Sequence, residues 1–207
     1  MSIDIDESKL KGTEFKLGLA WTAATAVGML VGYLPLAFLV GSLDLGLVRV
    51  IVPIITGALL GLAQYLVLRP YIAKSYDWII NQAVGWVVGF AIGLLVVQFL
   101  SRTALGMLLG FVAFGLIVSL FQYPALRREI PHLAPWVIAN VVGWTLGAYL
   151  SQLAAGAFFQ SALPTTFSGV LVSVGITGLV AGAVTAVALV WIVRQPDQLD
   201  VQVKGQS

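Results

Sequence analysis

The sequence contains no cysteine and a single histidine, and both shortages exclude classes of chemistry. Without cysteine the chain can form no disulfide, no thiolate-ligated metal site and no redox centre based on thiols. With His132 alone it cannot build a bis-histidine haem or a histidine-rich metal site. No cofactor is therefore implied by the residues present.

Charged residues are also scarce, at 10% of the chain against roughly a quarter in soluble domains. The long apolar runs contain no aspartate or glutamate apart from Asp77, in the turn where the third run begins, so the carboxylate relay of a typical proton-coupled pump is missing. The eleven basic residues are scattered at the ends of these runs rather than clustered on a face, so nucleic-acid binding is not expected. The only histidine lies outside the runs, so a serine within a run has no histidine beside it to act as a general base. We therefore predict that the protein is not an enzyme.

Apolar residues are abundant, at 59% of the chain. A helix needs about 20 residues to cross a hydrocarbon core of about 30 Å, and six runs are long enough. The sequence therefore predicts an all-α polytopic membrane protein with six transmembrane helices. The runs span approximately 15–41, 48–69, 76–100, 103–124, 133–160 and 167–193.

One signature, Trp-x6-Gly-x3-Gly, occurs near the start of every second run. Its tryptophans are Trp21, Trp78 and Trp136, separated by 57 and 58 residues. A repeat of this length predicts a helical hairpin built three times, and two crossings per unit make the units parallel, with pseudo-threefold symmetry about an axis normal to the membrane. The expected organisation is an N-terminal segment at 1–14, hairpins at 15–69, 70–128 and 129–194, and a C-terminal tail at 195–207.

The distribution of lysine and arginine predicts the orientation in the membrane. Nine of these residues lie in the two termini and the turns on the same side, while only Arg49 and Arg102 lie on the other side. The positive-inside rule then places both termini in the cytoplasm. Tryptophan and arginine at helix ends favour the cytoplasmic interface, where an indole buries its ring and keeps its N–H in water. The expected interface anchors are Trp21, Trp78, Trp136, Arg69, Arg127 and Arg194.

Small residues four apart occur on one face of every predicted helix, and such residues let helix backbones approach closely in lipid. In the second helix of each hairpin, one glycine lies twelve positions before the arginine at the helix end. These glycines, Gly57, Gly115 and Gly182, are aligned with one another. The expected helix-packing residues are Gly28, Gly32, Gly57, Gly61, Gly85, Gly89, Gly115, Gly143, Gly147 and Gly182.

A layer of polar side chains is predicted near the cytoplasmic face, either four residues after a tryptophan or five before an arginine. One interpretation is that these groups hydrogen-bond between helices and fix their register. The other is that they line a cavity for a solute, a lipid headgroup or a pigment. The layer consists of Thr25, Gln64, Gln82, Gln122 and Asn140.

The run Gly57-x3-Gly61-x2-Gln64-Tyr65-x3-Arg69, followed by Trp-x6-Gly-x3-Gly, resembles segments of uncharacterised small multipass bacterial membrane proteins of cyanobacterial type. The resemblance covers most of the chain. It implies a multipass protein of a bacterial inner membrane, of the cell or thylakoid type, and it transfers no activity and no binding residue.

Close-packed helices, short loops and the lack of catalytic or ion-coupling residues favour an accessory, scaffold or assembly subunit of a larger membrane complex, with lipid and other membrane proteins as partners. A small-solute transporter or channel that uses the polar layer is the alternative. A pigment- or quinone-binding subunit is a further alternative, since an amide oxygen can ligate a chlorophyll magnesium and glycine-lined faces can admit a flat ring.

The cysteine-free chain allows a direct test of the predicted orientation. Single cysteines at Ser8 and Gln206 are expected to react with an impermeant maleimide only from the cytoplasm, and one at Ser42 only from outside. Labelling of intact and opened cells distinguishes the two sides. The reverse pattern would contradict the orientation.

Overall fold

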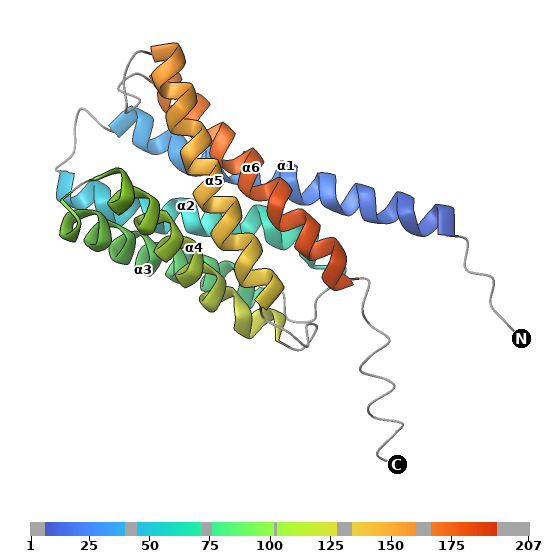
Figure 1. Ribbon diagram of the computed structural model, residues 1–207. Coiled ribbons are helices and arrows are strands. Elements are labelled where there is room, and N and C mark those ends of the chain that lie inside the picture. The colour runs from blue at the N-terminus through green and yellow to red at the C-terminus, as the bar shows by residue number, and fades with distance from the viewer. Residues whose placement is uncertain are drawn as a thin grey trace, which may run out of the picture.

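The computed structural model describes residues 7–39, 45–71, 76–101, 103–127, 134–159 and 167–193. In this part of the chain all regular structure is α-helical (Figure 1). Each helix is long and apolar enough to cross a membrane, which confirms the prediction of an all-α integral membrane protein with six candidate spans. The helices are α1 (Glu7–Leu39), α2 (Leu45–Leu68), α3 (Asp77–Phe99), α4 (Ala104–Leu126), α5 (Ala134–Phe159) and α6 (Phe167–Val193).

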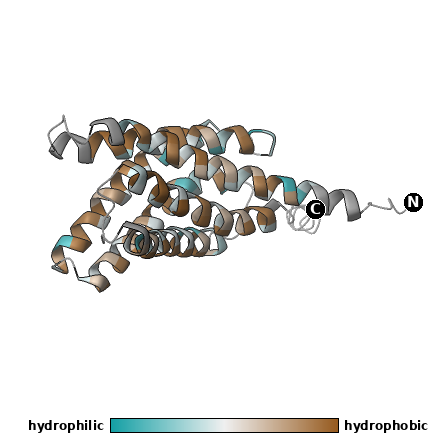
Figure 2. Cartoon of the chain, turned by 90° about the horizontal axis from the view of Figure 1, so that it is seen from above, coloured by the Kyte–Doolittle hydropathy of each residue, from teal (hydrophilic) through white to brown (hydrophobic). Residues whose placement is uncertain are grey.

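The helices form a closed ring in chain order. Each packs against the helices before and after it, α6 packs against α1, and no other pair approaches closely within the described residues. The start of α1 and the end of α6 lie at the same end of the bundle, as an even number of crossings requires (Figure 1). Apolar residues predominate along the helices (Figure 2), and many of them are exposed on the outside of the bundle, so the outer surface fits contact with lipid.

Glycines bring neighbouring helices into backbone contact. A methyl group placed on Gly32 of α1 would lie 2.7 Å from the Cα atom of Thr56 in α2, and one on Gly57 of α2 would lie 2.9 Å from the Cα atom of Ala83 in α3. No side chain fits at such distances. All ten glycines expected to pack have an atom of a neighbouring helix within 3.2 Å of such a methyl group.

In the third hairpin, the glycine that corresponds to Gly57 lies one helical turn before the one predicted from the distance to Arg194. Gly57 faces Ala83, the fifth residue after Trp78. In α6 the glycine that faces Ala26, the fifth residue after Trp21, is not Gly182 but Gly178, whose added methyl group would lie 2.9 Å from the Ala26 Cα atom. The alignment of Gly182 with Gly57 and Gly115 is therefore wrong.

The error follows from helix length. The arginines mark the positions where the helices end. α6 has 27 residues, against 24 in α2 and 23 in α4. The end of α6 therefore lies about one turn further from the packing glycines than the ends of α2 and α4 do. Contacts between backbones, rather than helix ends, set the alignment. The corresponding runs are Gly57-Gly61-Gln64-Leu68, Gly115-Ser119-Gln122-Leu126 and Gly178-Gly182-Thr185-Leu189. The pseudo-threefold rotation that would relate the three hairpins stays a prediction.

The close contact at Gly32 predicts that Gly32→Ala destabilises the fold by about 1–3 kcal/mol, the usual cost of overpacking, because the added methyl group meets the Thr56 backbone. Gly156→Ala is the matched control: the same methyl group meets nothing within 4 Å, and better helix propensity should make it neutral or stabilising by up to about 1 kcal/mol. Thermal unfolding in detergent measures both. Equal melting temperatures for the two variants would contradict the packing described.

Candidate functional site: a buried tryptophan triad and its polar ring

Trp21, Trp78 and Trp136 meet inside the bundle and form a triad. They come from α1, α3 and α5, which do not pack on one another, so the rings bridge the interior of the helix ring. Their centroids are 5.8, 5.9 and 6.0 Å apart pairwise, with interplanar angles of 68–72°. This edge-to-face arrangement is favourable for aromatic rings.

The triad does not anchor the protein at the lipid interface, and the expectation that its indole N–H groups contact water is wrong. Each of the three side chains is at most 1% exposed. The cause is the helix face on which they lie. That face also carries the packing glycines, which turn it toward the neighbouring helix and the interior.

Each indole N–H of the triad donates a hydrogen bond to the helix that precedes its own in the ring. These bonds satisfy donors that have no access to water, as burial requires. The three bonds run from Trp78 Nε1 to Gln64 Oε1 (3.1 Å), from Trp136 Nε1 to Gln122 Oε1 (2.8 Å) and from Trp21 Nε1 to Thr185 Oγ1 (2.8 Å).

Two of the acceptors also donate to a third helix, so each of these two joins three helices. Gln64 of α2 accepts from Trp78 of α3 and donates through Nε2 to the Thr25 hydroxyl of α1, at 3.1 Å. Gln122 of α4 likewise accepts from α5 and donates to the Gln82 side-chain oxygen of α3. The structure thus brings four of the five expected polar-layer residues together in two pairs.

Asn140, the fifth polar-layer residue, bonds within its own helix. Its Nδ2 donates to the carbonyl of Trp136 at 3.0 Å, and its Oδ1 accepts from Trp144 Nε1 at 3.2 Å. In α3 the same spacing places Gln82 four residues before Trp86, but no hydrogen bond joins them. The oxygen of Gln82 accepts from α4, and the nitrogens Gln82 Nε2 and Trp86 Nε1 are buried without a partner among the described residues.

Thr185 is the member of this site that sequence reasoning missed. It lies three residues after Gly182, as Gln64 lies three residues after Gly61, so the spacing Gly-x3-small-x2-polar could have found it. Its hydroxyl donates to the carbonyl of Ala181 at 2.7 Å, because a threonine is too short to reach across to α5 as glutamine does. We name the triad with Thr25, Gln64, Gln82, Gln122 and Thr185 the polar ring.

The predicted arginine anchors and the single histidine lie at or beyond the helix ends. Arg69 and Arg127 are exposed just beyond the ends of α2 and α4, and their role as interface anchors stays a prediction. Arg194 and His132 lie outside the described residues.

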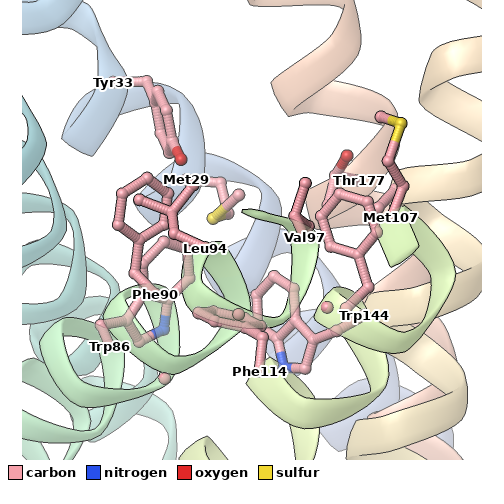
Figure 3. A pocket seen from close by; sticks show the side chains of 15 residues that line it. Met29, Tyr33, Trp86, Phe90, Leu94, Val97, Met107, Phe114, Trp144 and Thr177 are labelled. Atoms are coloured by element: carbon pink, nitrogen blue, oxygen red, sulfur yellow. The ribbon is translucent and has the colours of Figure 1, made fainter. Parts of the chain in front are cut away.

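A second aromatic cluster joins α3, α4 and α5, and its two tryptophans lie eight residues, about two helical turns, after Trp78 and Trp136. Trp86, Phe114 and Trp144 are 5.1–5.6 Å apart, with interplanar angles of 85–89°. Beyond them is an apolar cavity of about 270 Å³ (Figure 3). None of the five expected polar-layer residues lines this cavity, so the polar layer and the cavity are separate features.

The chemistry available at the polar ring is hydrogen bonding rather than proton transfer, since its members are amides, hydroxyls and indoles. Ser119, a buried hydroxyl three residues before Gln122, donates to the Leu116 carbonyl of its own helix at 2.7 Å. In the described part of the chain no group of three His, Cys, Asp or Glu side chains could hold a metal ion.

No family model, curated protein or solved structure matches the chain. The resemblance to small bacterial multipass proteins therefore stays a prediction.

The bonds of Gln64 predict that Gln64→Leu destabilises the protein by about 1–2 kcal/mol, because it leaves the Trp78 N–H buried without an acceptor. Gln98→Leu, at an exposed position of α3, is the matched control and should change little. Adding Trp78→Phe removes the unpaired donor, so the double variant should lose less stability than the sum of the single variants. Strict additivity in unfolding experiments would show that this bond contributes nothing.

Proposed function

We propose that this protein is a non-enzymatic integral membrane subunit that supports the assembly of a larger membrane complex. The observation that carries the proposal is the polar ring. Polar groups at membrane depth often mark a transport or ligand site, but here Thr25, Gln64, Gln82 and Gln122 are at most 2% exposed and bond to one another or to the triad. Such a layer fixes the relative positions of the six helices.

The triad argues against solute transport along the bundle interior. A solute moving through it would have to separate three indoles in mutual contact and break their three hydrogen bonds. Each of these bonds contributes roughly 1 kcal/mol and has no water to replace it. The transporter alternative, which places the solute at the polar layer, therefore requires opening the most densely bonded part of the interior.

Pigment binding is disfavoured by size. Sites for drug-sized ligands occupy roughly 300–1,000 Å³, and the cavity of about 270 Å³ is smaller than this range. A chlorophyll or haem macrocycle is larger than most such ligands and does not fit. The outer surface remains as the means of interaction, and side chains such as Tyr149 and Leu153 of α5 expose apolar area there that lipid or a partner helix can cover.

The proposal predicts that one membrane complex depends on this chain. In membranes solubilised gently and separated on a native gel, deletion of the gene should remove or shrink a single complex, and the wild-type chain should restore it. Mass spectrometry of that complex should find this chain in fixed stoichiometry with other integral membrane proteins. The Gly156→Ala chain, whose added methyl group meets nothing within 4 Å, serves as an expression control.

Two results would contradict the proposal. One is a chain that migrates alone while every membrane complex is unchanged by the deletion. The other is solute uptake by proteoliposomes of the purified protein above that of empty liposomes, which would favour the transporter alternative.

A further inference from the structure

The cavity occupies the half of the bundle beyond the second aromatic cluster. Its floor is formed by Trp86, Phe114 and Trp144 (Figure 3). Its outer part is lined by Val97, close to the end of α3, and Met107, close to the start of α4. From Trp86 to Val97 the cavity therefore follows α3 for about 16 Å, from the middle of the bundle toward one end.

The walls suit an apolar ring. The lining is almost wholly apolar, and Tyr33, Phe90 and Phe111 add aromatic faces and edges above the floor. An apolar cavity of about 150 Å³ stays free of water and binds benzene. This cavity of about 270 Å³ is partly open rather than enclosed, and its volume can accordingly hold a fused or substituted ring.

One polar group faces this apolar space. The hydroxyl of Tyr33 points into the cavity (Figure 3) and forms no hydrogen bond with any described residue. Thr177 also lines the cavity, but its hydroxyl already donates to the Ser173 carbonyl at 2.9 Å. The unpaired indole nitrogen of Trp86 is buried within the floor and has no surface open to the cavity.

We propose that this cavity binds a membrane-soluble quinone, with its ring among the aromatic side chains and one carbonyl oxygen accepting a hydrogen bond from Tyr33. A hydroxyl in an apolar cavity gains an acceptor only if the ligand brings one. A quinone carries its carbonyl groups on the ring itself. The ring can therefore occupy the cavity while one of its carbonyl oxygens contacts the Tyr33 hydroxyl. A saturated acyl chain fills the space but leaves the hydroxyl unpaired. This binding does not depend on the assembly role.

The test uses the full chain purified in detergent and the tail-free quinone 2-methyl-1,4-naphthoquinone, with binding measured by equilibrium dialysis and by quenching of tryptophan fluorescence. Saturable binding is expected for the wild type. Tyr33→Phe keeps the ring and removes the donor, so it should weaken binding about fivefold, the equivalent of one net hydrogen bond. Tyr149→Phe makes the same change on the outer surface and should leave binding unchanged.

Ala148→Phe should abolish binding by filling the cavity. Phenylalanine is compatible with this place, because Phe90 lies twelve residues after Trp78 as Ala148 lies twelve residues after Trp136, and both line the cavity. Ala157→Phe makes the same change at an exposed position of α5 and should bind like the wild type.

Naphthalene, which has the ring but no carbonyl, should bind more weakly than the quinone to the wild type and equally to the wild type and Tyr33→Phe. The proposal is overturned if the wild type does not bind saturably, or if Ala148→Phe binds normally. It is also overturned if naphthalene matches the quinone or if Tyr33→Phe has no effect. Should Ala148→Phe fail to fold, the comparison of Tyr33→Phe with Tyr149→Phe decides the question alone.

Discussion

The fold depends on satisfying three indole N–H groups that are buried where water cannot reach. An unpaired donor in a membrane interior costs several kcal/mol, so each tryptophan of the triad needs an acceptor from the protein. Gln64, Gln122 and Thr185 supply these acceptors, always from the helix that precedes the tryptophan in the ring. The bonds connect α2 to α3, α4 to α5 and α6 to α1, which are the contacts between successive hairpins and the one that closes the ring.

The packing glycines make these bonds possible. Because Gly57 meets Ala83 backbone to backbone, α2 and α3 approach closely enough for the Gln64 amide to reach the Trp78 indole across the interface. A larger residue at Gly57 would push the helices apart and lengthen the bond. Close backbone approach and hydrogen bonding therefore stabilise the same interfaces, and neither is expected to persist fully without the other.

The two halves of the interior differ in what they can do. At the polar ring, side chains fill the space and bond to one another, and a rigid layer results. Beyond Trp86, Phe114 and Trp144 the same helices leave a cavity, because the position twelve residues after the tryptophan is Tyr33 in α1 and Phe90 in α3 but only Ala148 in α5. A subunit built this way can hold a constant shape for its partners while keeping space for one small apolar ligand.

Much of this could be predicted from the sequence, because length and apolarity identify membrane helices and glycine spacing identifies their packing faces. The polar layer was also predictable, since Gln64 and Gln122 occupy matching positions. The burial of the triad was not predictable. A tryptophan near a helix end can lie at the membrane interface or in the protein interior, and the packing of the neighbouring helices decides which. The position of Thr185 was hidden by the greater length of α6. The cavity was not predictable either, because the spacing that relates Tyr33, Phe90 and Ala148 says nothing of the side chains that α4 and α6 add to its walls.

Hydrogen exchange of the indole N–H groups tests the central claim, that the triad forms a closed and internally bonded layer, most directly. The measurement is made by NMR on the full chain in micelles, with nitrogen-15 in the indoles and transfer into heavy water. Trp21, Trp78 and Trp136 should exchange far more slowly than Trp191, which is 41% exposed in the last turn of α6. Exchange of the triad at the rate of Trp191 would show that water reaches these groups, and would contradict the closed layer.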